Sequence, residues 1–169
     1  LLLKEGAYVA FGDIDVQAGE ALAKACGERA LFLRHDVSNE AEWQEVIAKV
    51  QAHFGPLDIL INNAGILLPG SIETATLAQF RQLMQVNADS CFLGCQQGIA
   101  AMKERGGSIV NMASVSTWLP IEGYAGYSAS KAAVAALTRA SALYCRKNGL
   151  AIRVNSLHPD GIYTPMMKA

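Results

Sequence analysis

The stretch Ser108–Lys131, SIVNMASVSTWLPIEGYAGYSASK, contains a short apolar strand, a polar loop and the beginning of a helix. Ser108–Met112 has the apolar character of a buried strand. After the loop, Tyr127 begins an alanine-rich segment that favours a helix as far as Arg146. A strand followed by a helix is the repeating unit of a parallel sheet.

The same unit recurs along the whole chain. Strands are predicted over residues 8–12, 31–33, 57–61, 108–112 and 151–157, and helices over 16–26, 39–54, 77–104 and 127–146. The strands are mostly apolar rather than alternating, which is typical of a sheet covered on both faces. We therefore predict an α/β fold with a doubly wound, Rossmann-like parallel sheet, formed by a single domain over residues 1–169.

The sequence begins and ends inside this pattern. Leu1–Lys4 resembles the last turn of a helix, and no glycine-rich G-x-G-x-x-G turn occurs in the chain. The chain stops soon after Thr164. We expect that the first strand, the glycine-rich phosphate loop and the C-terminal substrate loop lie outside these residues. Such a fragment, truncated at both ends, is not expected to bind a cofactor tightly by itself.

Composition argues against several partners. The net charge of −1 gives no electrostatic case for nucleic acid or an anionic membrane, and no apolar run is long enough to span a bilayer. Cys91 and Cys95 lie four residues apart in an apolar helical stripe and are predicted to be core thiols rather than metal ligands. We predict no metal site, and the cysteine pattern indicates reduced thiols in a cytoplasmic protein.

Polar or glycine-containing groups follow the predicted strands, where open α/β sheets bind their ligands. These groups are Asp13, Asp36, Asn62–Gly65, Ser114 and Pro159–Gly161. Each is also typical of an ordinary turn, which is the commoner role of Asp13 taken singly. A carboxylate at Asp13 can accept both hydroxyls of an adenosine ribose and would repel a 2′-phosphate, which favours NAD over NADP. Gly65 would let the backbone approach a ligand.

Tyr127 and Lys131 are four residues apart, so they project from one face of a helix. An ammonium beside a phenol favours the phenolate, and Ser114 can hydrogen-bond an oxygen held in front of it. Such a set can move a proton on or off an alcohol oxygen near neutral pH, although Tyr-x-x-x-Lys also occurs by chance. Asn87 is a polar residue in an apolar helix stripe. It needs a partner, either water or the Lys131 region, or it is a satisfied core amide.

Taken together, the motifs resemble one family over essentially all of the chain. With NNAG at residues 62–65, Asn87, Ser114, Tyr127-x-x-x-Lys131 and His158-Pro159, the chain resembles the short-chain dehydrogenases/reductases. The longer phrases NNAGILLPG, GGSIVNMASVS and RVNSLHPDGIYTPMM are similar to hydroxysteroid dehydrogenases of that family. Ser116 and Tyr124 lack the family's spacing to Lys131. Asp160 and Thr117 stand where many members have glycine.

The resemblance implies a role for each residue. Tyr127 would be the acid/base, and Lys131 would assist it and bind the nicotinamide ribose. Ser114 would orient the substrate oxygen, and Asn87 would hold a water that continues a proton relay through Lys131. Cofactor contacts are implied at Asp13 (ribose), Asp36 and Val37 (adenine), Asn63, Ala64 and Gly65 (along the cofactor), Pro159 and Gly161 (nicotinamide), and Ile162 and Thr164 (carboxamide and pyrophosphate side).

The predicted function is an NAD-dependent oxidoreductase that interconverts a secondary alcohol and a ketone, and the resemblance implies a 3β- or 17β-hydroxysteroid as substrate. The alternatives are a reductase of another ketone or an acyl-carrier substrate, and a non-catalytic cofactor-binding protein. The apolar segments Trp118–Ile121, Leu67-Leu68 and Met166-Met167 could form a wall for a flat substrate or be ordinary loop packing. The resemblance also implies a homotetramer, with the alanine-rich face Ala132–Ala136 against a second subunit.

Overall fold

The computed structural model describes residues 1–164 and 166. The chain forms two compact units, Leu1–Leu57 and Asp58–Ala169, and each is described by itself. No helix in the described part of the chain is long and apolar enough to cross a membrane.

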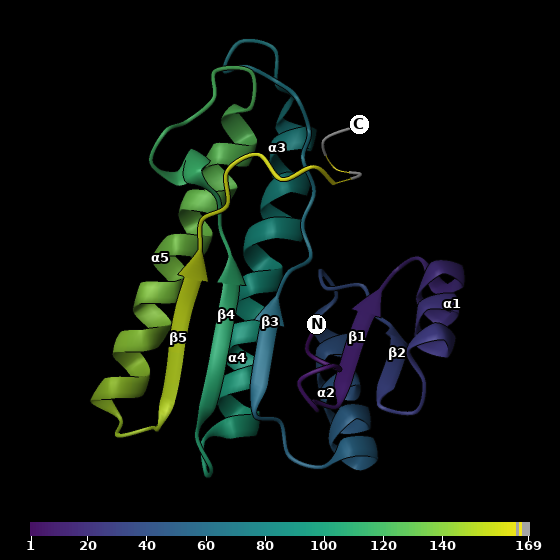
Figure 1. Ribbon diagram of the computed structural model, residues 1–169. Helices are drawn as coiled ribbons and strands as arrows, with labels where there is room; N and C mark the ends of the chain where they lie inside the picture. Colours follow the sequence, from purple (N-terminus) through teal and green to yellow (C-terminus); the bar gives the residue numbers. More distant parts are fainter. Residues whose placement is uncertain (165, 167–169) are drawn as a thin grey trace. The chain divides into compact units, whose positions relative to one another are not determined.

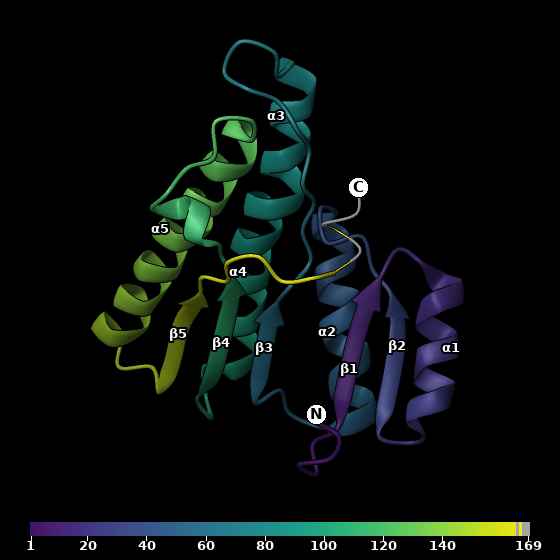
Figure 2. The ribbon, with the colours of Figure 1, turned by 45° about the horizontal axis from the view of Figure 1, so that its top comes forward.

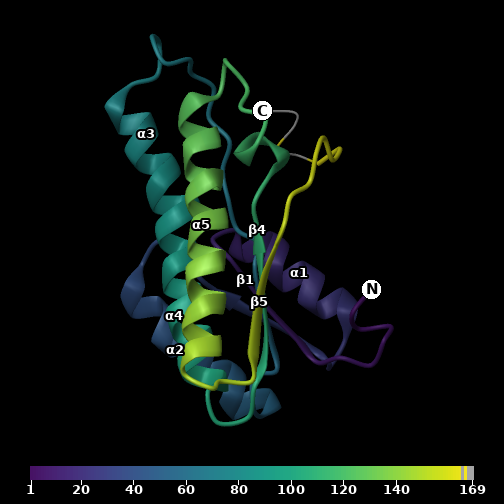
Figure 3. The ribbon, with the colours of Figure 1, turned by 90° about the vertical axis from the view of Figure 1, so that its left-hand side faces the viewer.

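The first unit is a two-stranded parallel sheet with a helix on each face (Figure 1 and Figure 3). Its elements are β1 (Val9–Asp13), α1 (Val16–Cys26), β2 (Ala30–Arg34) and α2 (Glu40–Phe54). Helix α1 lies very close to β2 because Gly19 faces the ring of Phe32. A Cβ added at Gly19 would stand only 2.1 Å from that ring.

The second unit carries the motifs of interest. Its elements are β3 (Ile59–Asn62), α3 (Leu77–Leu83), η1 (Met84–Asp89), α4 (Ser90–Met102), β4 (Gly107–Met112), η2 (Val115–Thr117), α5 (Ala125–Lys147) and β5 (Ile152–Leu157). The strands form a parallel sheet in the order β3-β4-β5. Helices α4 and α5 lie side by side on one face of this sheet (Figure 3). The buried apolar core between them includes Cys91, Met102, Ile109, Val134 and Val154.

These observations confirm the predicted fold class, with parallel strands and flanking helices. Within the first unit β1 pairs with β2, and within the second unit β4 pairs with both β3 and β5. The expected alignment of strand ends therefore holds within each sheet. In the second unit it brings Asn62, Met112 and Leu157 to one edge.

The single helix predicted over residues 77–104 is interrupted. Figure 2 shows α3 running into α4 as one long rod, but Met84–Asp89 between them is π-helical. Such π-bulges are rare and occur often at functional sites. Here the bulge contains Asn87, whose side chain is hydrogen-bonded to the backbone of Ile66 outside the helix. The hydrophobic repeat of the sequence does not predict this π-helical turn, because the turn depends on contacts with segments outside the helix.

Candidate active site

Tyr127 and Lys131 lie near the beginning of α5 and on the same face, as their spacing predicts. The ammonium nitrogen of Lys131 is 5.7 Å from the centroid of the Tyr127 ring. Lys131 is only 5% exposed, and its Nζ donates a hydrogen bond of 2.8 Å to the carbonyl of Met112 at the end of β4. Burial lowers the pKa of Lys131 from 10.5 to about 8. The lysine is therefore still mainly cationic at neutral pH.

Ser114 follows β4 and begins the short helix η2. Its Oγ accepts a hydrogen bond of 3.2 Å from the backbone N–H of Ser116, and the residue is buried. Within the described residues, neither the Ser114 hydroxyl proton nor the Tyr127 hydroxyl has a hydrogen-bond partner in the protein. Both groups can therefore bond to an oxygen brought in by a ligand. The structure shows no direct bond between the two side chains.

The side chain of Asn87 makes three hydrogen bonds. Its Oδ1 accepts from the N–H of Ile66 at 2.7 Å, and its Nδ2 donates to the Ile66 carbonyl at 3.0 Å and to Ser130 Oγ at 2.9 Å. Ser130 Oγ in turn donates to the carbonyl of Tyr127 at 2.7 Å. Asn87 is thus a satisfied buried amide, and it ties the loop after β3 to α5.

Gly65 lies beside the side chains of both Asn87 and Lys131. A Cβ added at Gly65 would stand 3.1 Å from Asn87 Oδ1 and 3.3 Å from Lys131 Nζ. Both polar atoms therefore face the same side of this glycine, where a larger residue would press against them. Gly65, Asn87 and Lys131 thus lie together, and Ser130 joins them through its bond to Asn87. Sequence reasoning missed Ser130, although a serine directly before Lys131 in an alanine-rich helix was a usable signal.

A buried polar network links α5 to the sheet beneath this group. Asn111 of β4 accepts from Asn62 Nδ2 of β3 at 2.8 Å and donates to Thr138 Oγ1 of α5 at 2.9 Å. Cys91 and Cys95 are buried beside it, as expected of core thiols. A hydrogen bond between the two thiols raises the pKa of Cys91 and lowers that of Cys95. Because buried polar groups need partners, this network resists sliding of α5 along β4.

The remaining predicted residues of the second unit border the same strand ends. Asn63 and Ala64 are exposed directly after β3, and Pro159 is half-buried after β5. The carbonyl of Pro159 accepts from the N–H of Val115 at 3.0 Å. The last three, Gly161, Ile162 and Thr164, are exposed.

Three predicted cofactor residues belong to the first unit. Asp13 is the last residue of β1, is exposed, and accepts a turn hydrogen bond of 3.0 Å from the N–H of Asp15. Asp36 Oδ1 accepts from the N–H and the hydroxyl of Ser38, and these two bonds lower the pKa of Asp36. The carbonyl of Val37 accepts from the indole N–H of Trp43 at 2.9 Å. Both aspartates thus stabilise turns through Oδ1. Their second carboxylate oxygen has no hydrogen bond to the described residues.

The three apolar segments that could form a substrate wall differ in their exposure to solvent. Trp118, Leu119 and Ile121 are strongly exposed, at 62%, 74% and 51%, which is unusual for packing residues of a loop. Leu67 and Leu68 are half-buried, and Met166 is exposed. Met167 lies outside the described residues.

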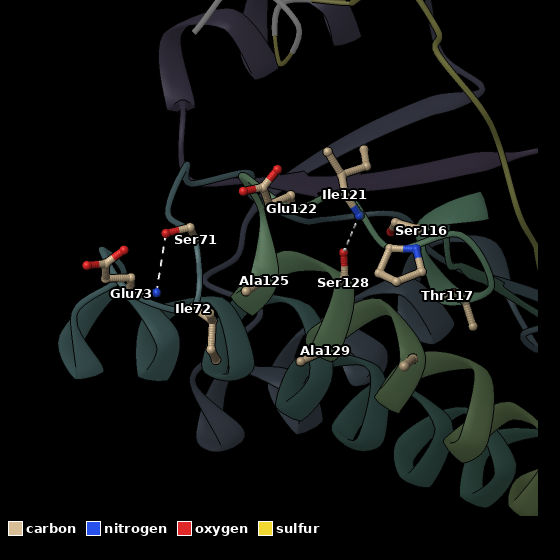
Figure 4. A pocket seen from close by; sticks show the side chains of 12 residues that line it. Ser71, Ile72, Glu73, Ser116, Thr117, Ile121, Glu122, Ala125, Ser128 and Ala129 are labelled. Carbon is tan, nitrogen blue, oxygen red and sulfur yellow. Dashed lines mark hydrogen bonds between the residues drawn. The ribbon is translucent and has the colours of Figure 1, made fainter.

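Figure 4 shows a shallow hollow between the loop at Ser71–Glu73, the loop at Thr117–Glu122 and the beginning of α5. Ser128 and Ala129 line it from the helix, and Ser128 Oγ accepts a long hydrogen bond of 3.5 Å from the N–H of Ile121. None of Asn87, Ser114, Tyr127 and Lys131 lines this hollow. It is therefore separate from the candidate catalytic group.

Comparison with known proteins gives consistent relatives. The 3-beta-hydroxysteroid dehydrogenase of Comamonas testosteroni is 69% identical over 169 residues, which cover 100% of this chain and 66% of that protein. The 3-alpha-(or 20-beta)-hydroxysteroid dehydrogenase of Mycobacterium tuberculosis is 39% identical over 166 residues, with 98% of this chain and 63% of that protein covered. The NADP-dependent (R)-specific alcohol dehydrogenase of Lentilactobacillus kefiri is 36% identical over 169 residues, which cover 98% of this chain and 67% of that protein.

The chain spans just under two thirds of the length of the two hydroxysteroid dehydrogenases. The family profile described as short chain dehydrogenase matches residues 1–169, from end to end. With parallel strands, flanking helices and Tyr127 and Lys131 together on α5, the chain belongs to the short-chain dehydrogenase family.

Proposed function

We propose that the protein to which this chain belongs is an NAD-dependent oxidoreductase that interconverts a 3β- or 17β-hydroxysteroid and the corresponding ketone. The observation that carries the proposal is the buried ammonium of Lys131 against the ring of Tyr127. The 69% identity to a 3-beta-hydroxysteroid dehydrogenase supports the substrate class. The exposed apolar surface of Trp118, Leu119 and Ile121 suits a flat, apolar substrate.

The proposed residues would act together on the alcohol oxygen. Tyr127 takes the hydroxyl proton during oxidation and returns it during reduction, while Ser114 donates a hydrogen bond to the same oxygen. Lys131, cationic at neutral pH with a pKa of about 8, stabilises the phenolate of Tyr127. Short-chain dehydrogenases bind a nicotinamide cofactor, which supplies the hydride acceptor. A water next to Asn87 Oδ1 and Lys131 Nζ would continue the proton path.

Cofactor contacts are proposed for residues of each unit. The bare backbone of Gly65 leaves room beside Lys131 that a Cβ would fill, which fits close approach of a ligand. We propose that the nicotinamide half contacts Asn63, Ala64, Gly65, Pro159, Gly161, Ile162 and Thr164. Asp13, Asp36 and Val37 would contact the adenosine half, since each aspartate retains an oxygen for a ligand.

We also propose that the two units are parts of one domain. The family profile matches residues 1–169 without interruption, across the boundary between the two units.

A reductase of another ketone is the second candidate, since the Lentilactobacillus relative is named an alcohol dehydrogenase. A non-catalytic binding protein would have no need of Ser114, Tyr127 and Lys131 together. Assays of the full-length protein with both cofactors, on 3β- and 17β-hydroxysteroids and simple secondary alcohols, separate these candidates. We expect the highest kcat/KM with a hydroxysteroid and NAD. Activity confined to simple alcohols or acyl-carrier substrates would contradict the substrate class, and binding without turnover would contradict the enzyme.

Replacing Asp13 by asparagine is expected to weaken the preference for NAD over NADP about tenfold. A carboxylate repels each negative charge of a phosphate by about 1–4 kcal/mol at 4 Å, depending on the local dielectric. The ratio of kcat/KM values for the two cofactors measures the effect. Asp15→Asn is the matched control, because Asp15 is a nearby exposed aspartate that caps α1 and asparagine caps equally well. A wild-type preference for NADP would contradict the proposed contact between Asp13 and the adenosine ribose.

The surface of α4 and α5 supports a homo-oligomer, proposed to be a tetramer. A shallow apolar hollow there is lined by Met84, Ala88, Asp89, Phe92, Ala133, Ala136, Leu137 and Ala140. Phe92 is 50% exposed, and the small alanines would let another helix approach closely. Analytical ultracentrifugation of the full-length protein measures the oligomeric state. We place the protein in the cytoplasm because its four cysteines are all free, three of them buried.

A further inference from the structure

His158 connects the ends of β4 and β5 through its side chain. Its Nδ1 is 3.1 Å from the carbonyl oxygen of Ser114, and its Nε2 is 3.0 Å from Ser156 Oγ. A carbonyl can only accept a hydrogen bond, so Nδ1 must carry the proton. In the neutral ring, Nε2 then accepts from the Ser156 hydroxyl. The carbonyl contact alone selects this tautomer, because the Ser156 hydroxyl can either donate or accept.

The residues before and after Ser114 are hydrogen-bonded to the chain at the end of β5. The N–H of Ala113 donates to the Leu157 carbonyl at 2.8 Å, and the N–H of Val115 donates to the Pro159 carbonyl at 3.0 Å. Between these two backbone bonds, His158 binds the carbonyl of Ser114 itself. The Trp118 ring lies over the imidazole, with centroids 5.4 Å apart and planes at 32°. The imidazole is therefore fixed by contacts on its edge and on its face.

Ser114 is correspondingly restricted. Its backbone is extended, with φ −165° and ψ 158°, and its Oγ accepts from the N–H of Ser116 at 3.2 Å. The hydroxyl proton remains free to point toward a ligand oxygen. A rotation of the peptide between Ser114 and Val115 would break the bond to His158 and turn η2, whose Ser116 N–H holds the hydroxyl oxygen.

We propose that His158 is a positioning residue for Ser114. By donating from Nδ1 to the Ser114 carbonyl, it sets the direction in which the Ser114 hydroxyl meets the substrate oxygen. The inference rests on the proposed function for the role of Ser114. It adds His158, as a residue that positions Ser114, to the proposed catalytic residues Ser114, Tyr127 and Lys131. Small errors in the placement of a catalytic group can cost large factors in rate.

The full-length protein with two conservative variants tests this role. The amide nitrogen of asparagine can take the place of Nδ1, whereas that of glutamine takes the place of Nε2. We expect His158→Gln to lower kcat for the hydroxysteroid about tenfold or more, with the KM for NAD unchanged. His158→Asn should keep most of the wild-type kcat. Ser156→Ala is the control, because its hydroxyl touches only Nε2, and it should change kcat little.

A double-mutant cycle separates positioning from general support of the fold. If His158 acts through Ser114, His158→Gln should cost no further activity in a Ser114→Ala background. Equal losses in both backgrounds, equal losses for the asparagine and glutamine variants, or full activity of His158→Gln would each overturn the proposal. Thermal unfolding of every variant identifies any that fail to fold.

A second measurement does not depend on turnover. Nitrogen-15 NMR of histidine-labelled protein reports which ring nitrogen carries the proton, and the signals that vanish in His158→Asn assign the residue. We expect the Nδ1–H tautomer at neutral pH. An Nε2–H tautomer would rule out donation to Ser114 even if the enzyme is active. A wild-type protein without dehydrogenase activity, but with the Nδ1–H tautomer, would instead refute the proposed function and leave the His158–Ser114 bond established.

Discussion

Replacing Tyr127 by phenylalanine is expected to lower kcat by about 10²–10⁴-fold, the usual contribution of a general acid–base group. The substitution removes one oxygen that has no hydrogen-bond partner in the described protein, so the fold should be unaffected. Lys131 would keep its bond to the Met112 carbonyl. Steady-state kinetics with a hydroxysteroid, together with a fluorescence titration of NADH, measure the loss of turnover and the retention of cofactor binding.

Tyr124→Phe is the matched control for this experiment. Tyr124 lies three residues earlier, at the non-helical N-cap of α5, and is seven residues from Lys131 rather than four. We expect near wild-type kcat from that variant. Near-normal activity in Tyr127→Phe, or an equal loss in both variants, would remove the proposed mechanism.

Replacing Lys131 by methionine is expected to abolish most activity and, at the same time, to stabilise the fold near pH 7. The lysine is nearly inaccessible, and burial lowers its pKa from 10.5 in the unfolded chain to about 8. That difference corresponds to about 3 kcal/mol of unfolding free energy lost when the charge is buried. Methionine has similar length and no charge. Subtracting about 1 kcal/mol for the lost bond to Met112 leaves a gain of about 2 kcal/mol.

The pH dependence identifies the cause of this gain. Below about pH 8, Lys131 is charged in both the folded and the unfolded chain, and the full cost of burying the charge applies. Between about pH 8 and 10.5, the unfolded chain binds a proton that the folded chain has released, so wild-type stability rises with pH. The advantage of Lys131→Met should therefore shrink across that range and be gone above it.

Urea unfolding at pH 7 and pH 10 measures the two free energies. Lys147→Met, at the exposed end of the same helix, is the control and should change stability little at either pH. A variant at position 131 that is less stable than wild type at pH 7, or a gain that does not depend on pH, would contradict the proposed cost of the buried ammonium. The expected result would show an active-site group retained at the expense of stability.

Much of the candidate site was predictable because its geometry is local. The spacing of Tyr127 and Lys131 places them on one helix face whatever the rest of the fold does, and the structure finds the ammonium 5.7 Å from the ring. The place of Ser114 after an apolar strand follows equally from short-range pattern. Asn87 stood out as a polar residue in an apolar stripe, but its partners, Ile66 and Ser130, are far away in the sequence.

The sequence by itself determined the α/β class, the order of strands and helices, and the Tyr127–Lys131 face, because hydrophobic periodicity and helical spacing are short-range properties. Only the tertiary structure decided the π-helical turn at Asn87, the close grouping of Gly65 with Asn87 and Lys131, and the attachment of His158 to Ser114. Each depends on hydrogen bonds or packing between segments distant in the chain.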